Sequence, residues 1–336
     1  MRTLEREVAS LAASSAFSGV VRVDAGGECA FELAFGLAHR AHGIPNTTDT
    51  QFAIASGVKG FTAVTVASLV ADGVVELDTT ARSLLGNDLP LIGDDVTVEH
   101  LLAHRSGIGD YVDEDAELDV DGYVLPVPVH TLVNTEDYLA VLGGHPAKFD
   151  RDERFSYCNS GYVVLALLAE RATGLEFAEL VRRRVCEPAG MTATAFLRSD
   201  ELPGTAAAGY LGAGGAIRTN VLHLPVRGSG DGGIYSTAAD LSAFWDALHR
   251  GDLLPTDCVA ELVRPRSDVP AMASRYGLGF WLHPSSGAVF VEGSDAGVSF
   301  RSAHDPARGL TYTVASNTSG GAWPLVRLLH DRICGG

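Results

Sequence analysis

The sequence predicts an α+β fold in which the two ends of the chain build one antiparallel sheet. Three observations support this prediction: short β-type runs lie near the start, apolar residues at helical spacing fill the middle, and more β-type runs precede a terminal helix. The first two runs, at 18–23 and 30–37, flank a Gly-rich turn and predict a hairpin. A hairpin is too small to be stable alone, so we expect it to pair with the C-terminal strands.

The middle of the chain is predicted to be mainly helical. A short strand at 51–55 leads into a helix from 56 to 71, where apolar residues recur at helical spacing until Asp72-Gly73. The same spacing predicts further helices, separated by Gly- and Pro-containing loops, near 97–104, 135–142, 160–172, 175–186 and 237–250.

The C-terminal part predicts the strands that complete the sheet, at 276–283, 288–292, 297–303 and 310–316, followed by a helix over 322–333. We therefore expect flanking helices on a sheet domain made of 1–75 and 270–336. An inserted, mainly helical domain would span 76–269, with the functional site in the cleft between the two domains.

Composition excludes several classes of protein. The 336 residues carry a net charge of −17, which repels phosphate backbones and argues against nucleic-acid binding. No apolar run reaches the roughly 18 residues of a membrane span, and the first residues do not resemble a secretory signal. The five cysteines form no C-x-x-C pair, which is typical of reduced thiols. We expect a cytoplasmic protein without nucleic-acid or membrane partners; the sequence leaves its oligomeric state open.

The first candidate for chemistry is Ser56-Gly57-Val58-Lys59. Lys59 follows Ser56 by three residues on a predicted helix, so the two side chains share a face. A serine hydroxyl needs a nearby base, and a buried lysine can lose its proton whereas arginine cannot. Of the 25 basic residues, 23 are arginine, and the lysines are Lys59 and Lys148. The alternative is a surface lysine on an ordinary helix.

Two further segments carry polar groups suited to the same chemistry. Tyr157 and Asn159 point the same way from an extended segment, where a phenol can pass protons and an amide can hold an ammonium or a carbonyl. The strand-turn-strand over 291–298 would expose backbone N–H groups to an oxyanion. Taken singly, the first is typical of a turn before a helix and the second of an ordinary hairpin.

A metal site is a weaker candidate. His100 and His104 are spaced at i, i+4 on a predicted helix, but no third ligand is placed near them. We expect neither a metal nor another cofactor.

The three segments together resemble the serine β-lactamase and penicillin-binding-protein superfamily, in which S-x-x-K, Y-x-N and a Gly-containing strand occur in this order. The flanking segments resemble the class C β-lactamase-related serine hydrolases, the esterase and D-aminopeptidase type. The similarity covers roughly residues 15–330 and is carried by 101–108 (LLAHRSGI), 159–162 (NSGY), 187–191 (EPAGM), 232–241 (GGIYSTAADL) and 276–280 (YGLGF).

The resemblance implies a role for each matching residue. Ser56 would be the nucleophile and Lys59 its activating partner, while Tyr157 would act as a general base that later protonates the leaving group. Asn159 would position the substrate and Lys59, and the N–H groups of Ser56 and Ser294 would form the oxyanion hole. Whether Lys59 or Tyr157 takes the first proton stays open.

The third motif departs from the family pattern. Where relatives have K-T-G or H-x-G, this chain has Val291-Glu292-Gly293, so the usual cation is replaced. A carboxylate facing the substrate would disfavour β-lactams and peptides ending in a carboxylate, and would favour neutral or amine-bearing substrates. Alternatively, Glu292 points away from the site, because side chains alternate along a strand.

We therefore expect a serine hydrolase that forms an acyl-enzyme with a small-molecule ester or amide. An acyltransferase and a non-catalytic binding relative are the alternatives. The acidic loop that begins at 113–122 and runs to about 131 would overhang the site and select against anions.

Overall fold

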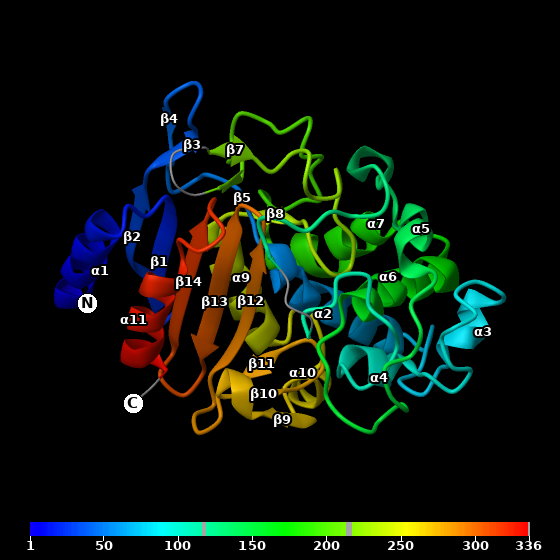
Figure 1. Ribbon diagram of the computed structural model, residues 1–336. Helices are drawn as coiled ribbons and strands as arrows, with labels where there is room; N and C mark the ends of the chain where they lie inside the picture. The colour runs from blue at the N-terminus through cyan, green and yellow to red at the C-terminus, as the bar shows by residue number, and fades with distance from the viewer. Residues whose placement is uncertain (116–118, 213–216, 335–336) are drawn as a thin grey trace.

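The computed structural model describes residues 1–115, 119–212 and 217–334. Its centre is an eight-stranded antiparallel sheet in the order β2-β1-β14-β13-β12-β11-β10-β9 (Figure 1). The strands are β1 (Gly19–Ala25), β2 (Glu28–Phe35), β9 (Ser267–Val269), β10 (Ser274–Tyr276), β11 (Trp281–Leu282), β12 (Val289–Asp295), β13 (Val298–Asp305) and β14 (Leu310–Ser316). The predicted α+β fold with one sheet from both chain ends is confirmed.

The N-terminal hairpin joins the sheet through β14. This strand pairs with β1 on one side, where Gly19 faces Ser316, and with β13 on the other, where Ser299 faces Ser316. The last strand in the sequence therefore lies inside the sheet, between β1 and β13. The segment 276–283, expected as one strand, instead contains the end of β10 and all of β11, which pair with each other; Gly279, with φ of +86°, lies between them.

Each face of the sheet buries a separate apolar cluster. On one face, α1 (Arg2–Ser14) and α11 (Trp323–Ile333) pack on side chains such as Val21 and Tyr312. On the other, α2 (Val58–Ala71) and α9 (Ala238–Arg250) pack on side chains such as Val20 and Val291. Figure 1 shows α1 and α11 on one side of the strands and most other helices opposite. The sequence pattern did not predict α1.

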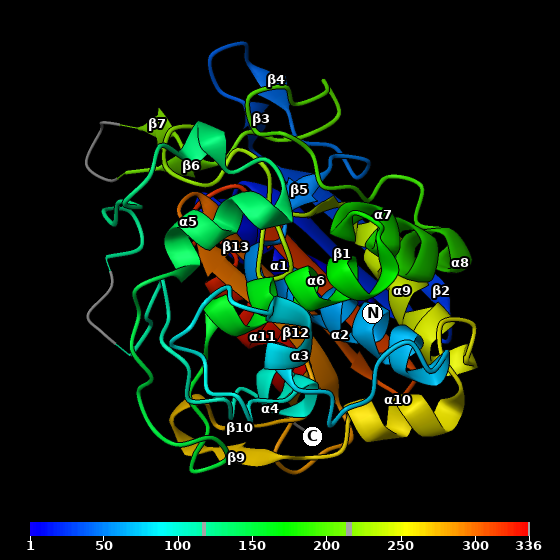
Figure 2. The ribbon, with the colours of Figure 1, turned by 90° about the vertical axis from the view of Figure 1, so that its right-hand side faces the viewer.

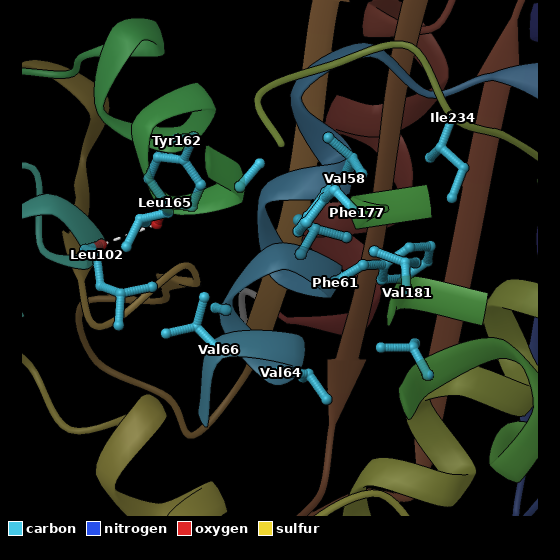
Figure 3. Packing of buried hydrophobic residues seen from close by; sticks show 14 of the residues in the cluster. Val58, Phe61, Val64, Val66, Leu102, Tyr162, Leu165, Phe177, Val181 and Ile234 are labelled. Carbon is cyan, nitrogen blue, oxygen red and sulfur yellow. Dashed lines mark hydrogen bonds between the residues drawn. The ribbon is translucent and has the colours of Figure 1, made fainter. Parts of the chain in front are cut away.

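Helix α2 lies at the centre of the larger cluster. Its residues from Val58 to Leu69 are all buried, so the helix is enclosed on every side and not only along one stripe. Figure 3 shows Phe61 and Val64 packed among side chains of other elements, including Tyr162, whose hydroxyl donates to the carbonyl of Leu102 at 2.8 Å. The turn that precedes this helix is therefore attached to a closely packed core.

The rest of the chain consists of α6 and shorter elements; Figure 2 shows α3, α4 and α5 near α2 and α6, and β3 and β4 apart from them. The α-helices are α3 (Ala81–Leu85), α4 (Val98–Leu102), α5 (Leu139–Leu142), α6 (Asn159–Thr173), α7 (Phe177–Val181), α8 (Glu187–Ala189) and α10 (Thr256–Leu262). The short strands are β3 (Leu37–His39), β4 (Ile44–Pro45), β5 (Phe52–Ala53), β6 (Tyr210–Leu211), β7 (Arg218–Thr219) and β8 (Tyr235–Ser236). Single turns are η1 (Ala55–Gly57), η2 (Val129–Thr131), η3 (Thr135–Tyr138), η4 (Arg182–Cys186) and η5 (Pro270–Met272).

Among the described residues, none of the helices combines the length and the apolar character that crossing a lipid bilayer requires.

Candidate active site

Ser56 lies in a tight turn that connects β5 to α2. The turn η1 contains Ala55, Ser56 and Gly57, and the N–H of Gly57 donates to the carbonyl of Ile54 at 2.9 Å. Ala55 has φ of +43°, a left-handed conformation that costs a residue with a Cβ about 1–2 kcal/mol. The surrounding core holds this strained turn in place, and Ser56 stays partly exposed at its tip.

Lys59 contacts Ser56 from within the protein. Its side chain is 3% exposed, and Nζ lies 2.9 Å from Ser56 Oγ. Nζ also donates to Asn159 Oδ1 and to the main-chain oxygen of Asp231, both at 2.8 Å. The contacts with Asn159 and Asp231 hold Nζ next to Ser56 Oγ.

Burial lowers the pKa of Lys59 from its ordinary value of 10.5, because removal from water disfavours the ammonium; nearby carboxylates, Asp231 first among them, oppose this shift. A neutral Lys59 amine can accept the Ser56 proton and still donate to Asn159 and Asp231. The environment therefore suits a general base.

Asn159 is the first residue of α6 and is fixed on all sides. Its main-chain N–H donates to Asp110 Oδ2 at 2.8 Å, and the N–H of Ser160 donates to Asp110 Oδ1 at the same distance. Asp110 thus binds the N-terminus of the helix, where a carboxylate is favoured. The Asn159 amide donates to Val112 O at 3.0 Å and to Glu114 Oε1 at 3.2 Å, which leaves its oxygen for Lys59.

Tyr157 also lies beside the Lys59 amine. Its ring stacks on Trp281 at 6.2 Å between centroids and lies 4.4 Å from the ring of His104. Lys59 Nζ lies 4.8 Å from the centre of the Tyr157 ring. Burial raises the pKa of Tyr157 well above 10, and a side-chain hydrogen bond with Ser56 opposes that shift only in part. The phenol is therefore protonated at neutral pH.

The free edge of β12 runs beside η1. β11 pairs with β12 only at Val289 and Phe290, so the residues after them have no strand partner on that side. Gly293 lies so close to the turn that a Cβ there would be 2.3 Å from Ile54 O and 2.7 Å from Ser56 N. Glycine is thus required at this position, and Ser294 follows it at the edge of the site.

A cavity of about 330 Å³ opens beside Ser56. Asn159 and Ser294 line it, and so do Glu114 of the predicted acidic loop and two carboxylate residues that the motif analysis did not single out, Asp231 and Asp295. The loop after α4 covers it and contributes apolar and aromatic side chains, among them Tyr111, Val112, Val120, Tyr123 and Leu125. The predicted overhanging loop therefore borders the cavity; residues 116–118 of its acidic part lie outside the described residues.

The model of the family described as "Beta-lactamase" matches residues 4–332, almost the entire chain. The chain belongs to the beta-lactamase family. A penicillin-binding protein of Bacillus halodurans has a similar crystal structure, with a TM-score of 0.91 and 34% identity over 97% of this chain and 100% of that one.

Two curated members of the beta-lactamase family are hydrolases by name. The esterase EstB of Burkholderia gladioli is 32% identical over 52% of this chain and 45% of its own length. A D-aminopeptidase of Brucella anthropi is 28% identical over 80% of this chain and 49% of its own length. The chain spans about half the length of these relatives, and the resemblance inferred from the motifs is confirmed.

The structure also accounts for the altered third motif. Val291, which stands where the resemblance implied a cation, is 2% exposed in the apolar core. A Cβ at Gly60 of α2 would lie only 2.6 Å from Val291 Cγ1, so the valine packs closely on the helix. An apolar residue therefore fills this position instead of a charged one.

The expectation that the Glu292 carboxylate faces the substrate does not fit this geometry. Glu292 lies opposite Arg301 on β13 and accepts a hydrogen bond from Arg301 Nε at 2.9 Å. Its side chain is 13% exposed, and it is not among the residues that line the cavity. Side chains alternate along β12, so Val291 and Gly293 face α2 and η1, while Glu292 pairs with Arg301 on the opposite face of the sheet.

We expect Glu292→Gln to destabilise the protein by about 1–3 kcal/mol, because it leaves the half-buried Arg301 guanidinium without its counter-charge. Urea unfolding measures the change. Asp94→Asn is the matched control: Asp94 pairs with Arg82 but is 89% exposed, so its loss changes stability by less than about 0.5 kcal/mol. Equal effects of the two variants would contradict the assignment.

His100 and His104 serve different structural purposes. His100 Nδ1 accepts from the N–H of Thr97 and so caps α4, whereas His104 Nδ1 accepts from the N–H of Cys158 in a core of aromatic rings. Within the described residues, no group of three or more His, Cys, Asp or Glu side chains is arranged to hold a metal ion. The His104 ring instead supports the segment that carries Tyr157.

Proposed function

We propose that this protein is a serine hydrolase that forms an acyl-enzyme on Ser56 with a small ester or amide. The observation that carries the proposal is the contact of 2.9 Å between Ser56 Oγ and the buried amine of Lys59, beside a cavity of substrate size. The names of two relatives, an esterase and a D-aminopeptidase, agree with acyl transfer to water from esters or amides.

In the proposed acylation, Ser56 Oγ transfers its proton to neutral Lys59 and attacks the substrate carbonyl. The negative charge that develops on the carbonyl oxygen is bound by the N–H groups of Ser56 and Ser294. The C–O or C–N bond then breaks as Tyr157 gives its proton to the leaving group, and Lys59 returns a proton to Tyr157. In deacylation, water attacks the acyl carbon while its proton passes through Tyr157 to Lys59. The bond between the acyl carbon and Ser56 Oγ then breaks, Lys59 returns the proton to Ser56, and the acid is released.

The two pKa shifts favour Lys59 over Tyr157 as the first base. Burial lowers the pKa of Lys59, which makes the neutral amine accessible, and raises the pKa of Tyr157, which keeps the phenol protonated. A protonated phenol is suited to act as the acid for the leaving group.

The lining also supports discrimination against carboxylate-bearing β-lactams. Among the described residues that border the cavity, three are acidic and none is Lys or Arg. Val291 supplies no positive charge at the place where the resemblance implied a cation. An anionic substrate would therefore meet like charges and no counter-ion.

The proposal predicts that Ser56→Ala lowers kcat/KM for a p-nitrophenyl ester of a short acid by at least about 1,000-fold, because the nucleophile is lost. Intact mass spectrometry of the wild type with a slow ester should show one acyl adduct, which the variant lacks. Circular dichroism checks that the variant is folded. Equal turnover by the two proteins would refute the catalytic role and leave a binding relative, whereas ester products formed with an added alcohol would identify an acyltransferase.

The role of Lys59 as base predicts the pH dependence of acylation. kcat/KM should rise with pH as Lys59 loses its proton and should reach a plateau above the pKa of Lys59. Burial lowers that pKa from the ordinary 10.5, so the rise should be complete at a lower pH than for a free lysine. Stopped-flow release of p-nitrophenol measures the profile after subtraction of spontaneous hydrolysis. A profile with no rising limb at any pH below 10.5 would contradict proton transfer to Lys59.

A further inference from the structure

The cavity beside Ser56 is lined by two carboxylates that accept hydrogen bonds from tyrosine hydroxyls. The Asp231 carboxylate, in a residue 7% exposed, accepts from the Tyr111 hydroxyl at 2.5 Å. The Asp295 carboxylate accepts from the Tyr123 hydroxyl at 3.0 Å. Neither forms an ion pair with a Lys or Arg in the described part of the chain, whereas Asp113 and Asp115 of the covering loop both pair with Lys148.

The amine of Lys59 attracts the Asp231 carboxylate through space but forms no ion pair with it. It contacts Asp231 through the main-chain oxygen, and its other two contacts are with Ser56 Oγ and Asn159 Oδ1. Burial raises the pKa of Asp231, and it raises that of Asp295 to about 6, with repulsion from Asp231 contributing to the second shift. Such carboxylates gain stability when a cation enters between them.

The position of Tyr157 indicates which part of a substrate enters the cavity. In the proposed mechanism Tyr157 protonates the leaving group, and its ring stacks on Trp281 beside β11. Tyr157 is not among the residues that line the cavity, whereas Ser56, Asn159 and Ser294 are. The leaving group therefore departs on the Tyr157 side, and the acyl part of the substrate occupies the cavity.

Most of the remaining lining is apolar. It includes side chains from four segments: Leu125, Tyr138, Leu197, Leu224 and Val226. The volume of about 330 Å³ is near the lower end of the range of roughly 300–1,000 Å³ for small-molecule sites. An acyl group that carries one cation and one apolar side chain matches this combination.

We propose that the cavity selects aminoacyl substrates, that is, esters or amides whose acyl part carries a protonated amine and an apolar group. Asp231 and Asp295 are the residues that determine this specificity. The inference rests on the proposed function, because it takes Ser56 as the nucleophile and Tyr157 as the acid for the leaving group.

Three p-nitrophenyl esters that differ only in the amine test the proposal: those of leucine, N-acetyl-leucine and 4-methylpentanoic acid, the first two as both enantiomers. We expect kcat/KM for the better leucine enantiomer to exceed that of both uncharged esters at least 10-fold. Asp231→Asn and Asp295→Asn should each lower this ratio at least fivefold. Asp94→Asn, which removes an exposed carboxylate far from the cavity lining, should keep the wild-type ratio.

A binding measurement decides the inference independently of turnover. The Ser56→Ala variant, titrated calorimetrically, should bind leucinamide at least 10-fold more tightly than 4-methylpentanamide. Equal binding of the two amides, or an unchanged ester ratio in both Asp variants, overturns the inference. Ser56-dependent hydrolysis of the uncharged esters without preference for leucine would leave the proposed function intact. Absence of any acyl adduct would refute the proposed function while the binding result still decides the inference.

Discussion

The Lys59→Arg variant should lose at least about 1,000-fold in the rate of Ser56 acylation although the charge is kept. Arginine cannot give up its proton near neutral pH, so it cannot take the proton of Ser56. A guanidinium also cannot reproduce the three contacts of 2.8–2.9 Å that one nitrogen makes with Ser56, Asn159 and Asp231. Stopped-flow measurement of p-nitrophenol release, with intact mass to detect the acyl group, gives this rate.

The chain offers a matched control for this substitution. Lys148, the other lysine, pairs with Asp113 and Asp115 at 2.8 Å and makes no contact with Ser56. Lys148→Arg preserves those ion pairs and should acylate at the wild-type rate within about threefold. If a folded Lys59→Arg protein forms the adduct within tenfold of the wild-type rate, Lys59 is not the base.

The Gly293→Ala variant should lose at least about 100-fold in kcat/KM and about 1–3 kcal/mol in the free energy of unfolding. The added Cβ would lie 2.3 Å from Ile54 O, 2.7 Å from Ser56 N and 2.9 Å from Ala55 Cβ. Because two of these atoms belong to the backbone, β12 must move away from η1. That movement separates Ser294 from Ser56 and so opens the proposed oxyanion hole. Urea unfolding and ester hydrolysis measure the two effects.

Gly287→Ala is the control for Gly293→Ala. Gly287 precedes the same strand, and a Cβ there would meet no atom within 4 Å. It should change neither stability nor kcat/KM by more than about 0.5 kcal/mol. A Gly293→Ala protein as active and as stable as Gly287→Ala would show that the close approach of β12 to Ser56 is not needed for the reaction.

The sequence predicted what depends on local pattern and on the order of motifs. The 3.6-residue spacing put Lys59 on the same face as Ser56, and the two contact each other in the structure. The Y-x-N segment predicted that Tyr157 and Asn159 point toward one site, and both contact Lys59. The alternating runs at both ends predicted the shared sheet. Each of these predictions needs only residues a few positions apart, or a pattern shared with known proteins.

Other features of the site depend on contacts between distant residues. Glu292 was expected either to face the substrate or to point away, and only the pairing of β12 with β13, which puts it opposite Arg301, favours the second. Glu114, Asp231 and Asp295 belong to three separate segments and line one cavity. No local signal in the sequence distinguishes Asp231 and Asp295 from acidic residues on the surface.

What the sequence alone determined is therefore the family and the architecture, and it also supplied the candidate reactive groups, because periodicity and motif order can be read directly from the chain. The tertiary structure decided which charges face the cavity. It buried Val291 against Gly60, paired Glu292 with Arg301, and left Asp231 and Asp295 without an ion pair to Lys or Arg among the described residues. The physical reason is that the direction and environment of a side chain depend on strand register and on packing between segments far apart in sequence.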